Sequence, residues 1–260
     1  MDLHDYRPLL DRLVAVAAAD DRILAVLLYG SHARGEADAY SDIDVGLVAT
    51  DSAFDQLVAE SPELVRKVGE PLLIEDFGDP TNLHVILADG GHMELIWSRA
   101  GNLVVDGPYR ALLDKAGVLE QAIGRPPAQA SAEDVRRLVQ SFWHDVGHVI
   151  TAIGRGQTLW AHGQLEELRR VCLNLARLQA GGPLEGVEAY WKVEHALAAR
   201  HLDALRATIV PPEVGPMHDA ALRLVRLYRE LATDLAASHG IPYPAELDRL
   251  LSDQMERMGR

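Results

Sequence analysis

The chain of 260 residues is 48% hydrophobic and 25% charged, which is typical of an ordinary globular protein of one or two domains and excludes a largely disordered chain. It contains no unbroken apolar run of about 18 residues, so we expect no membrane span, and acidic residues near its start favour a cytoplasmic protein over a secreted one. A single cysteine, Cys172, excludes an internal disulfide and metal sites made of several thiolates.

The formal net charge of −14 is unevenly distributed. Residues 1–125 contain 10 basic and 22 acidic side chains, whereas residues 126–260 contain 15 and 17. Binding to a nucleic-acid backbone needs basic surface. The acidic first half therefore argues against a long nucleic acid as partner, and it suits metal ions or a small cationic molecule better.

The first half alternates helical patterns with short apolar runs. Helices are expected over 3–19 and 53–68, and strands over Ile23–Tyr29, Asp42–Val48, Pro71–Phe77, Leu83–Ala88 and Met93–Trp97. Asp89-Gly90-Gly91 predicts a hairpin turn between the last two strands. Asp106-Gly107-Pro108 is expected to lead into a helix that ends near Gly124.

The second half shows only helical periodicity. Consecutive prolines in Arg125-Pro126-Pro127-Ala128-Gln129-Ala130 indicate a domain boundary, and Ser131 with Asp134 predicts a capping box beyond it. Helical patterns follow over about 133–153, 159–180, 185–207, 217–238 and 245–257. The predicted fold class is α+β: a small mixed β-sheet with flanking helices over residues 1–125, and an all-α helical bundle over residues 131–260.

One segment contains residues that could bind a phosphate group and a metal ion. A buried strand ends at Gly30-Ser31, where a short helical turn begins, and free N–H groups at such a turn suit a phosphate. Asp42 and Asp44 alternate with buried residues on the next strand, so they project from one face, about 6.6–6.8 Å apart. Hard oxygen ligands beside a phosphate-binding turn favour Mg²⁺. A lone pair of such aspartates is more often a solvated strand end, but the combined spacing predicts a magnesium–triphosphate site.

The string from Gly30 to Asp44, GS-x(3)-G-x(6)-D-x-D, resembles the signature of the DNA-polymerase-β-like nucleotidyltransferase superfamily. The resemblance implies a nucleotidyltransferase fold in which Gly30 and Ser31 bind the phosphates of a nucleotide while Asp42 and Asp44 bind Mg²⁺. It also implies a third carboxylate on a later strand, and Glu94 is the residue that fits, unless it is an outward-facing strand residue.

The role of Glu94 follows from the same resemblance. In polymerases of the superfamily the third acid is an aspartate that binds metal, whereas in antibiotic-modifying members a glutamate is often the general base for the acceptor hydroxyl. Because this chain has glutamate, we favour the base, and a metal contact by Glu94 stays open. The implied reaction uses ATP with Mg²⁺ and transfers AMP.

In size and organisation the chain is similar to aminoglycoside and lincosamide nucleotidyltransferases. This similarity implies an adenylyltransferase whose acceptor is a hydroxyl of a small, cationic antibiotic. The helical domain would bring basic groups to the triphosphate, and Lys192 is the preferred candidate, with an ordinary surface lysine as the alternative. Nucleotidylation of a protein, as by an antitoxin of the superfamily, and a non-catalytic nucleotide-binding module are the other functions considered. The oligomeric state stays open.

A second motif lies in the helical half. His144 and His148 are one helical turn apart, a spacing that can bind zinc. Metalloprotease motifs have glutamate after the first histidine, Gly147 weakens the helix, and no third ligand is evident, so an ordinary helix face is favoured. Phe142, Trp143 and Asp145 could bind an acceptor, although an aromatic pair on a helix belongs more often to the core.

Overall fold

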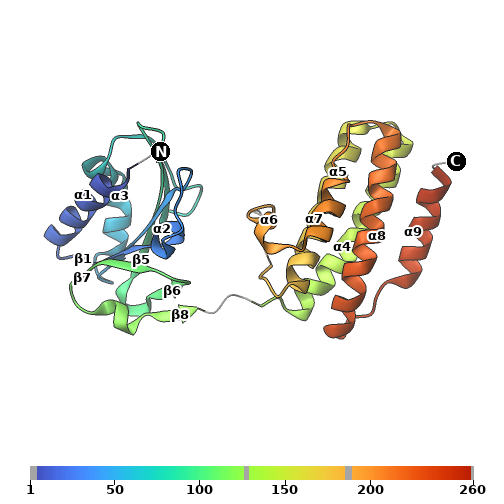
Figure 1. The fold of residues 1–260 in the computed structure, drawn as a ribbon. Coiled ribbons are helices and arrows are strands. Elements are labelled where there is room, and N and C mark those ends of the chain that lie inside the picture. Colours follow the sequence, from blue (N-terminus) through green and yellow to red (C-terminus); the bar gives the residue numbers. More distant parts are fainter. Residues whose placement is uncertain (1–4, 126–128, 185–188, 259–260) are drawn as a thin grey trace. The chain divides into compact units, whose positions relative to one another are not determined.

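The structure, a computed structural model, describes residues 5–125, 129–184 and 189–258. The chain divides into two compact units, Met1–Pro127 and Ala128–Arg260, each with its own hydrophobic core (Figure 1). The first unit contains all the described strands, and the second is entirely helical in its described part. The expected α+β class is therefore confirmed.

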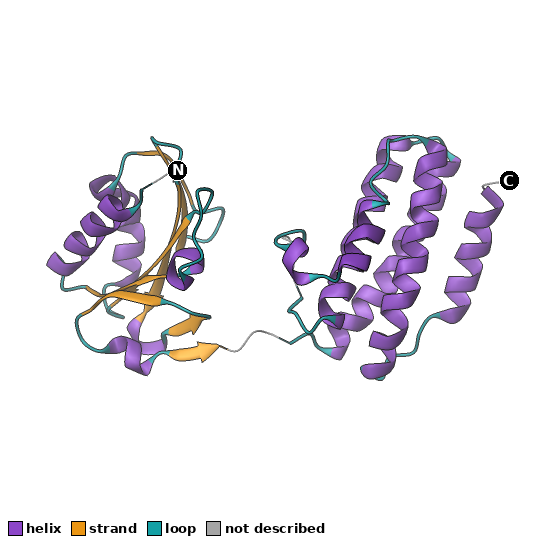
Figure 2. Cartoon of the chain, in the orientation of Figure 1, coloured by secondary structure: helices purple, strands orange, loops and turns teal. Residues whose placement is uncertain are grey.

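The first unit is built on a six-stranded mixed sheet with the strand order β3-β4-β5-β2-β1-β7. The central strands β2 and β5 pair in parallel, and all the other neighbours are antiparallel. Figure 2 shows the sheet in orange with helices packed against it. The strands are β1 (Ile23–Leu28), β2 (Ile43–Ala49), β3 (Pro71–Glu75), β4 (Asn82–Leu87), β5 (His92–Arg99) and β7 (Arg110–Asp114).

The two faces of this sheet have different environments because side chains alternate along each strand. On one face, residues such as Val45, Leu83 and Leu95 are buried in a core shared with α1 (Arg7–Ala19) and α3 (Phe54–Val68). On the opposite face, a smaller cluster covers only part of β1 and β2. Its members are Ala25, Leu27, Val48, Leu103, Val105 and Leu119. The rest of this second face remains half-exposed and carries the polar side chains.

The hairpin predicted at Asp89-Gly90-Gly91 is confirmed. β4 and β5 pair in antiparallel fashion on either side of it, and the Gly90 N–H donates to the Leu87 carbonyl at 2.9 Å. Gly90 has a φ of +83°, a conformation that glycine adopts without steric cost.

The helix expected after Asp106-Gly107-Pro108 is wrong. Residues Arg110–Asp114 form β7, and the short 3₁₀ helix η2 (Val118–Gln121) and the strand β8 (Ile123–Arg125) follow. β8 pairs in parallel with β6 (Val104–Asp106) in a separate two-stranded sheet. Local periodicity misses β7 because this strand is stabilised by backbone pairing with the otherwise free edge of β1, a contact between segments distant in sequence.

The second unit is a helical bundle whose described helices surround one apolar core. They are α4 (Ala132–Gly154), α5 (Thr158–Gln179), α6 (Val193–Ala196), α7 (Ala199–Arg206), α8 (Val214–Ser238) and α9 (Ala245–Met258). The single helix expected over 185–207 is wrong in its described part: α6 and α7 are separate, because Leu197 and Ala198 have extended backbone. Residues 185–188 lie outside the described residues. None of the described helices is long and apolar enough to cross a membrane.

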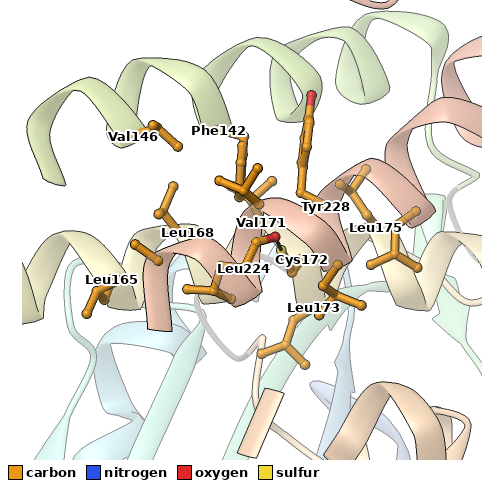
Figure 3. Close-up of a cluster of buried hydrophobic side chains, with 14 of the residues drawn as sticks. Phe142, Val146, Leu165, Leu168, Val171, Cys172, Leu173, Leu175, Leu224 and Tyr228 are labelled. Carbon is orange, nitrogen blue, oxygen red and sulfur yellow. Dashed lines mark hydrogen bonds between the residues drawn. The ribbon is translucent and has the colours of Figure 1, made fainter. Parts of the chain in front are cut away.

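Aromatic side chains form the centre of this core. The Phe142 and Tyr228 rings stack with centroids 3.8 Å apart, and the Tyr228 hydroxyl donates to the Val139 carbonyl at 2.8 Å. Figure 3 shows Phe142 on one helix and Tyr228 on another, with Cys172 among the apolar side chains around them. Phe142 and Trp143 are completely buried, so they belong to the core and are not available to stack on an acceptor.

The start of α4 confirms the predicted capping box. The Ser131 hydroxyl oxygen accepts a hydrogen bond from the Asp134 N–H at 3.1 Å, and the Asp134 carboxylate accepts one from the Ser131 N–H at 3.0 Å. These two bonds satisfy N–H groups that have no partner inside the helix. They define where the first helix of the bundle begins.

Candidate active site

Asp44 and Glu94 lie next to each other on the two central strands. In the parallel pairing of β2 and β5, Asp44 is the register partner of Glu94. Paired residues of adjacent strands point to the same face, and the strands are about 4.8 Å apart. Since the neighbouring Val45 and Leu95 are buried in the core under α1 and α3, both carboxylates project from the half-exposed face.

The chain turns at Gly30 directly against Asp44. The Tyr29 N–H donates to the Asp44 backbone oxygen at 2.9 Å, and the five-residue helix α2 (Gly30–Arg34) begins there. Gly30 has a φ of +63°, and a Cβ atom at this position would lie 1.9 Å from Asp44 Oδ2. Only glycine therefore allows the backbone and this carboxylate to be so close. The first residue of the Gly-Ser pair and the second aspartate thus form one local structure.

Asp42 and Ser31 lie at the edges of this arrangement. Asp42 immediately precedes β2 and is exposed, and Ser31 is half-buried in α2. Among the described residues, the one group of three potential metal ligands whose ligand atoms all lie within 4.8 Å of one another is elsewhere in the chain. Asp44 and Glu94 are adjacent by strand register, whereas the ligand atoms of Asp42, Asp44 and Glu94 do not all lie within 4.8 Å of one another.

Lys192 lies in the second unit, immediately before α6. It is exposed, and its ammonium group lies over the Trp191 ring, 4.2 Å from the centroid. A contact of Lys192 with the triphosphate stays a prediction.

Two polar residues of β4 next to Glu94 were missed by the sequence analysis. Asn82 Nδ2 donates a hydrogen bond of 2.5 Å to Glu94 Oε1, and His84 is the antiparallel register partner of Glu94. Asn82 Oδ1 is buried and accepts no hydrogen bond within the described structure. Alternation with the buried Leu83 and Val85 could have placed both polar side chains on the face of Glu94.

A cationic residue near the Gly30 turn was also missed. Arg110 on β7 is exposed and is the register partner of Leu28, two residues before Gly30. Burial and the nearby Arg110 guanidinium hold the pKa of His32 below its usual range, and Asp42 opposes them. His32, Arg110 and Ser41 line a cavity of about 360 Å³. The sequence analysis placed Arg110 in a helix, so no signal pointed to this position.

The acidic side chains provide the donor atoms that a hard divalent cation prefers. Mg²⁺ binds carboxylate oxygens, and one or two of them are sufficient when substrate phosphates and waters complete its shell. Asp44 and Glu94 supply such a pair on a face that is not covered by the core, and the absence of a side chain at Gly30 lets the turn pack closely against Asp44 Oδ2. The residues therefore fit a magnesium-dependent phosphate site.

A glycine turn packed on an acid of a mixed sheet, with a second acid on the adjacent parallel strand, agrees with what the resemblance to nucleotidyltransferases implies. The family model for streptomycin adenylyltransferase matches residues 3–258. The chain belongs to this family, and it is a nucleotidyltransferase enzyme.

Solved structures and curated proteins were also compared. An aminoglycoside 6-adenyltransferase from Bacillus subtilis is similar with 16% identity and a TM-score of 0.49, over 97% of this chain and 98% of that chain. A structure of the E. coli MS115-1 CdnC:HORMA-deltaN complex is similar with 13% identity and a TM-score of 0.28, over 86% and 90%. A search of curated proteins found no relative.

Proposed function

We propose that this enzyme transfers AMP from ATP, with Mg²⁺, to a hydroxyl group of an aminoglycoside. The observation that carries the proposal is the register of Asp44 with Glu94 beside the Gly30 turn, in a chain of the streptomycin adenylyltransferase family. A site for phosphates and a candidate base are then adjacent on one sheet face. Nucleotidyl transfer requires these two elements.

Asp42 and Asp44 would hold Mg²⁺ together with the substrate phosphates. When bound, the ion would neutralise negative charge on the phosphates as it develops during the transfer. Gly30 and Ser31 would bind the phosphates through the backbone and the hydroxyl group, which can donate to a phosphate oxygen. Glu94 could also contact the metal, and the Glu94 variant described in the Discussion tests that alternative.

Glu94 is proposed as the general base. Its carboxylate takes the proton of the acceptor hydroxyl, whose oxygen forms a bond to the α-phosphorus of ATP. The bond between this phosphorus and the oxygen that bridges to the β-phosphorus breaks, and pyrophosphate leaves. Glu94 then releases the proton to water. The hydrogen bond from Asn82 Nδ2 holds the Glu94 carboxylate in a defined orientation, which such a transfer requires.

The charge of the first half supports a polycationic acceptor. Residues 1–125 carry 12 more acidic than basic side chains. A surface of this sign attracts amino sugars and raises their local concentration. It disfavours RNA as an acceptor for the same electrostatic reason.

The direct experiment is an incubation of the protein with α-labelled ATP and Mg²⁺ with aminoglycosides, lincosamides or proteins as separate acceptors. Label on an aminoglycoside is the expected result. Label on a lincosamide would correct the acceptor class, and label on a protein would replace the proposal by protein nucleotidylation. Thermal stabilisation by ATP without transfer to any acceptor would instead support a nucleotide-binding module.

Replacing Gly30 with alanine tests the turn. The new Cβ would collide with Asp44 Oδ2, and the positive φ costs a side chain about 1–3 kcal/mol. We expect a large loss of transfer together with a lower melting temperature. Gly117→Ala is the matched control, because Gly117 has nearly the same φ, +64°, and no atom within 4 Å of the added Cβ. If both variants lost equal stability and kept equal activity, the turn would have no catalytic role.

Arg110, which lines a cavity with His32 of α2, would donate to a phosphate of ATP, and replacing it with glutamine tests this contact. A charge-assisted hydrogen bond is worth roughly 1.5–3 kcal/mol, so we expect the KM for ATP to rise by about 10-fold or more while kcat changes less. Lys115→Gln is the control, since Lys115 follows the other end of β7 and its ammonium donates to the Asp20 carbonyl at 2.8 Å. An unchanged KM in Arg110→Gln would remove Arg110 from the phosphate site.

A further inference from the structure

Three potential metal ligands converge on one side of α4 in the helical unit. His144, Asp145 and His148 each offer one ligand atom, and these atoms all lie within 4.8 Å of one another. α4 continues through Gly147 without a break, so the helical spacing that brings His148 next to the other two is intact. The third ligand that the sequence did not reveal is Asp145. It is close to both histidines because it precedes His148 by three residues.

The separations within the cluster match metal coordination. His144 Nδ1 lies 3.0 Å from Asp145 Oδ1, and the centroids of the two imidazole rings are 4.4 Å apart. Zinc bonds to nitrogen and oxygen of about 2.0–2.1 Å place neighbouring ligands of a tetrahedron roughly 3.3 Å apart. Small side-chain rotations would therefore bring all three ligand atoms to one ion.

A contact from α5, which packs beside α4 in this unit, supports the same conclusion (Figure 1). His148 Nδ1 lies 3.2 Å from Gln164 Oε1. An amide oxygen only accepts, so the Nδ1 of a neutral His148 donates and its lone pair is on Nε2. Histidines that bind metals usually donate their second ring nitrogen to an oxygen in this manner, which sets the tautomer and the ring orientation. Trp160 of α5 also flanks the His148 ring, with centroids 5.8 Å apart.

We propose that His144, Asp145 and His148 form a binding site for Zn²⁺ or a similar borderline transition metal, separate from the proposed magnesium site. Two imidazoles and one carboxylate suit such ions better than Mg²⁺, which prefers oxygen ligands only. Three protein ligands leave the fourth tetrahedral position to water or to another donor. His144 is exposed and the other two residues are half-buried, so an ion can reach the site from solvent.

The test is a calorimetric titration of the full-length, chelator-treated protein with ZnCl₂ in excess Mg²⁺, which saturates oxygen-only sites. We expect one equivalent of Zn²⁺, bound about 100-fold more weakly or not at all in His148→Ala. Gln164→Leu keeps all three ligands and should weaken binding by roughly 10–100-fold, the effect of losing the oxygen that orients a ligating histidine. Visible absorption of bound Co²⁺, used in place of Zn²⁺, should change in both variants.

Two controls separate this site from other binding. His162→Ala removes an exposed histidine of α5 and should leave Zn²⁺ binding unchanged. Asp44→Asn should also leave it unchanged, because Asp44 belongs to the proposed magnesium site. Loss of the Zn²⁺ equivalent in Asp44→Asn, or equal affinities in wild type and His148→Ala, would overturn the proposal. His144→Ala removes another proposed ligand, at an exposed position. It tests Zn²⁺ binding even if His148→Ala fails to fold.

Discussion

The substitution Asp44→Asn is expected to abolish nucleotidyl transfer while the protein stays folded. Asp44 combines two properties: its carboxylate is packed against the Gly30 turn, and it is in register with Glu94. The amide has the same shape but no negative charge for a divalent cation. Electrostatic stabilisation by a bound metal is worth several kcal/mol, which corresponds to a loss of about 10³-fold or more in kcat/KM.

The measurement is the rate of label transfer from ATP as a function of Mg²⁺ concentration, with thermal unfolding of each variant alongside. Asp11→Asn is the matched control, because Asp11 is an exposed residue of α1 and the change in charge is the same. We expect Asp11→Asn to behave like the wild type. Near-normal transfer by Asp44→Asn would contradict the proposed metal site.

The second large effect is expected for Glu94→Gln. A positioned general base contributes about 10²–10⁴-fold, so kcat should fall by this factor while the affinity for ATP with Mg²⁺ stays close to that of the wild type. The glutamine oxygen can still accept the hydrogen bond from Asn82 Nδ2, which preserves the local structure. The variant therefore separates proton transfer from binding.

The Glu94 prediction has a defined alternative outcome. If Glu94 is mainly a metal ligand, Glu94→Gln should weaken the binding of ATP with Mg²⁺ together with kcat, as Asp44→Asn is expected to do. Glu70→Gln is the control, since Glu70 is exposed between α3 and β3. If kcat were unchanged in Glu94→Gln, Glu94 would be neither the base nor a necessary ligand.

Much of the first unit could be predicted because its signals are local. The turn at Gly30, the alternation around Asp44 and the hairpin at Gly90 depend on residues within a few positions of one another. Hydrophobic periodicity alone shows which face of a helix or strand is apolar and is therefore buried. For this reason most of the central strands and the start of α4 were expected close to their observed positions, within the one or two residues by which element boundaries vary.

The sequence analysis did not predict the contacts of Asn82, Arg110 and Asp145. The first two contact residues of other strands, and Asp145 approaches both histidines only when α4 is a continuous helix. Asn82 meets Glu94 across a strand pair, and Arg110 lies near His32 of α2 only because β7 pairs with β1. Local periodicity gives no information about backbone hydrogen bonds to a strand that is distant in sequence. For this reason the segment that forms β7 was predicted to be helical.

The amino-acid sequence alone predicts a magnesium–triphosphate site from its carboxylates and glycine turn, and the resemblance of their spacing to a family signature implies nucleotidyl transfer. Which side chains lie next to each other was decided by the tertiary structure. The parallel register of β2 and β5 pairs Asp44 with Glu94, and the packing of α5 against α4 brings Gln164 to His148. The physical reason is that strand register and helix packing minimise the free energy of the whole unit, to which each short segment contributes only a part.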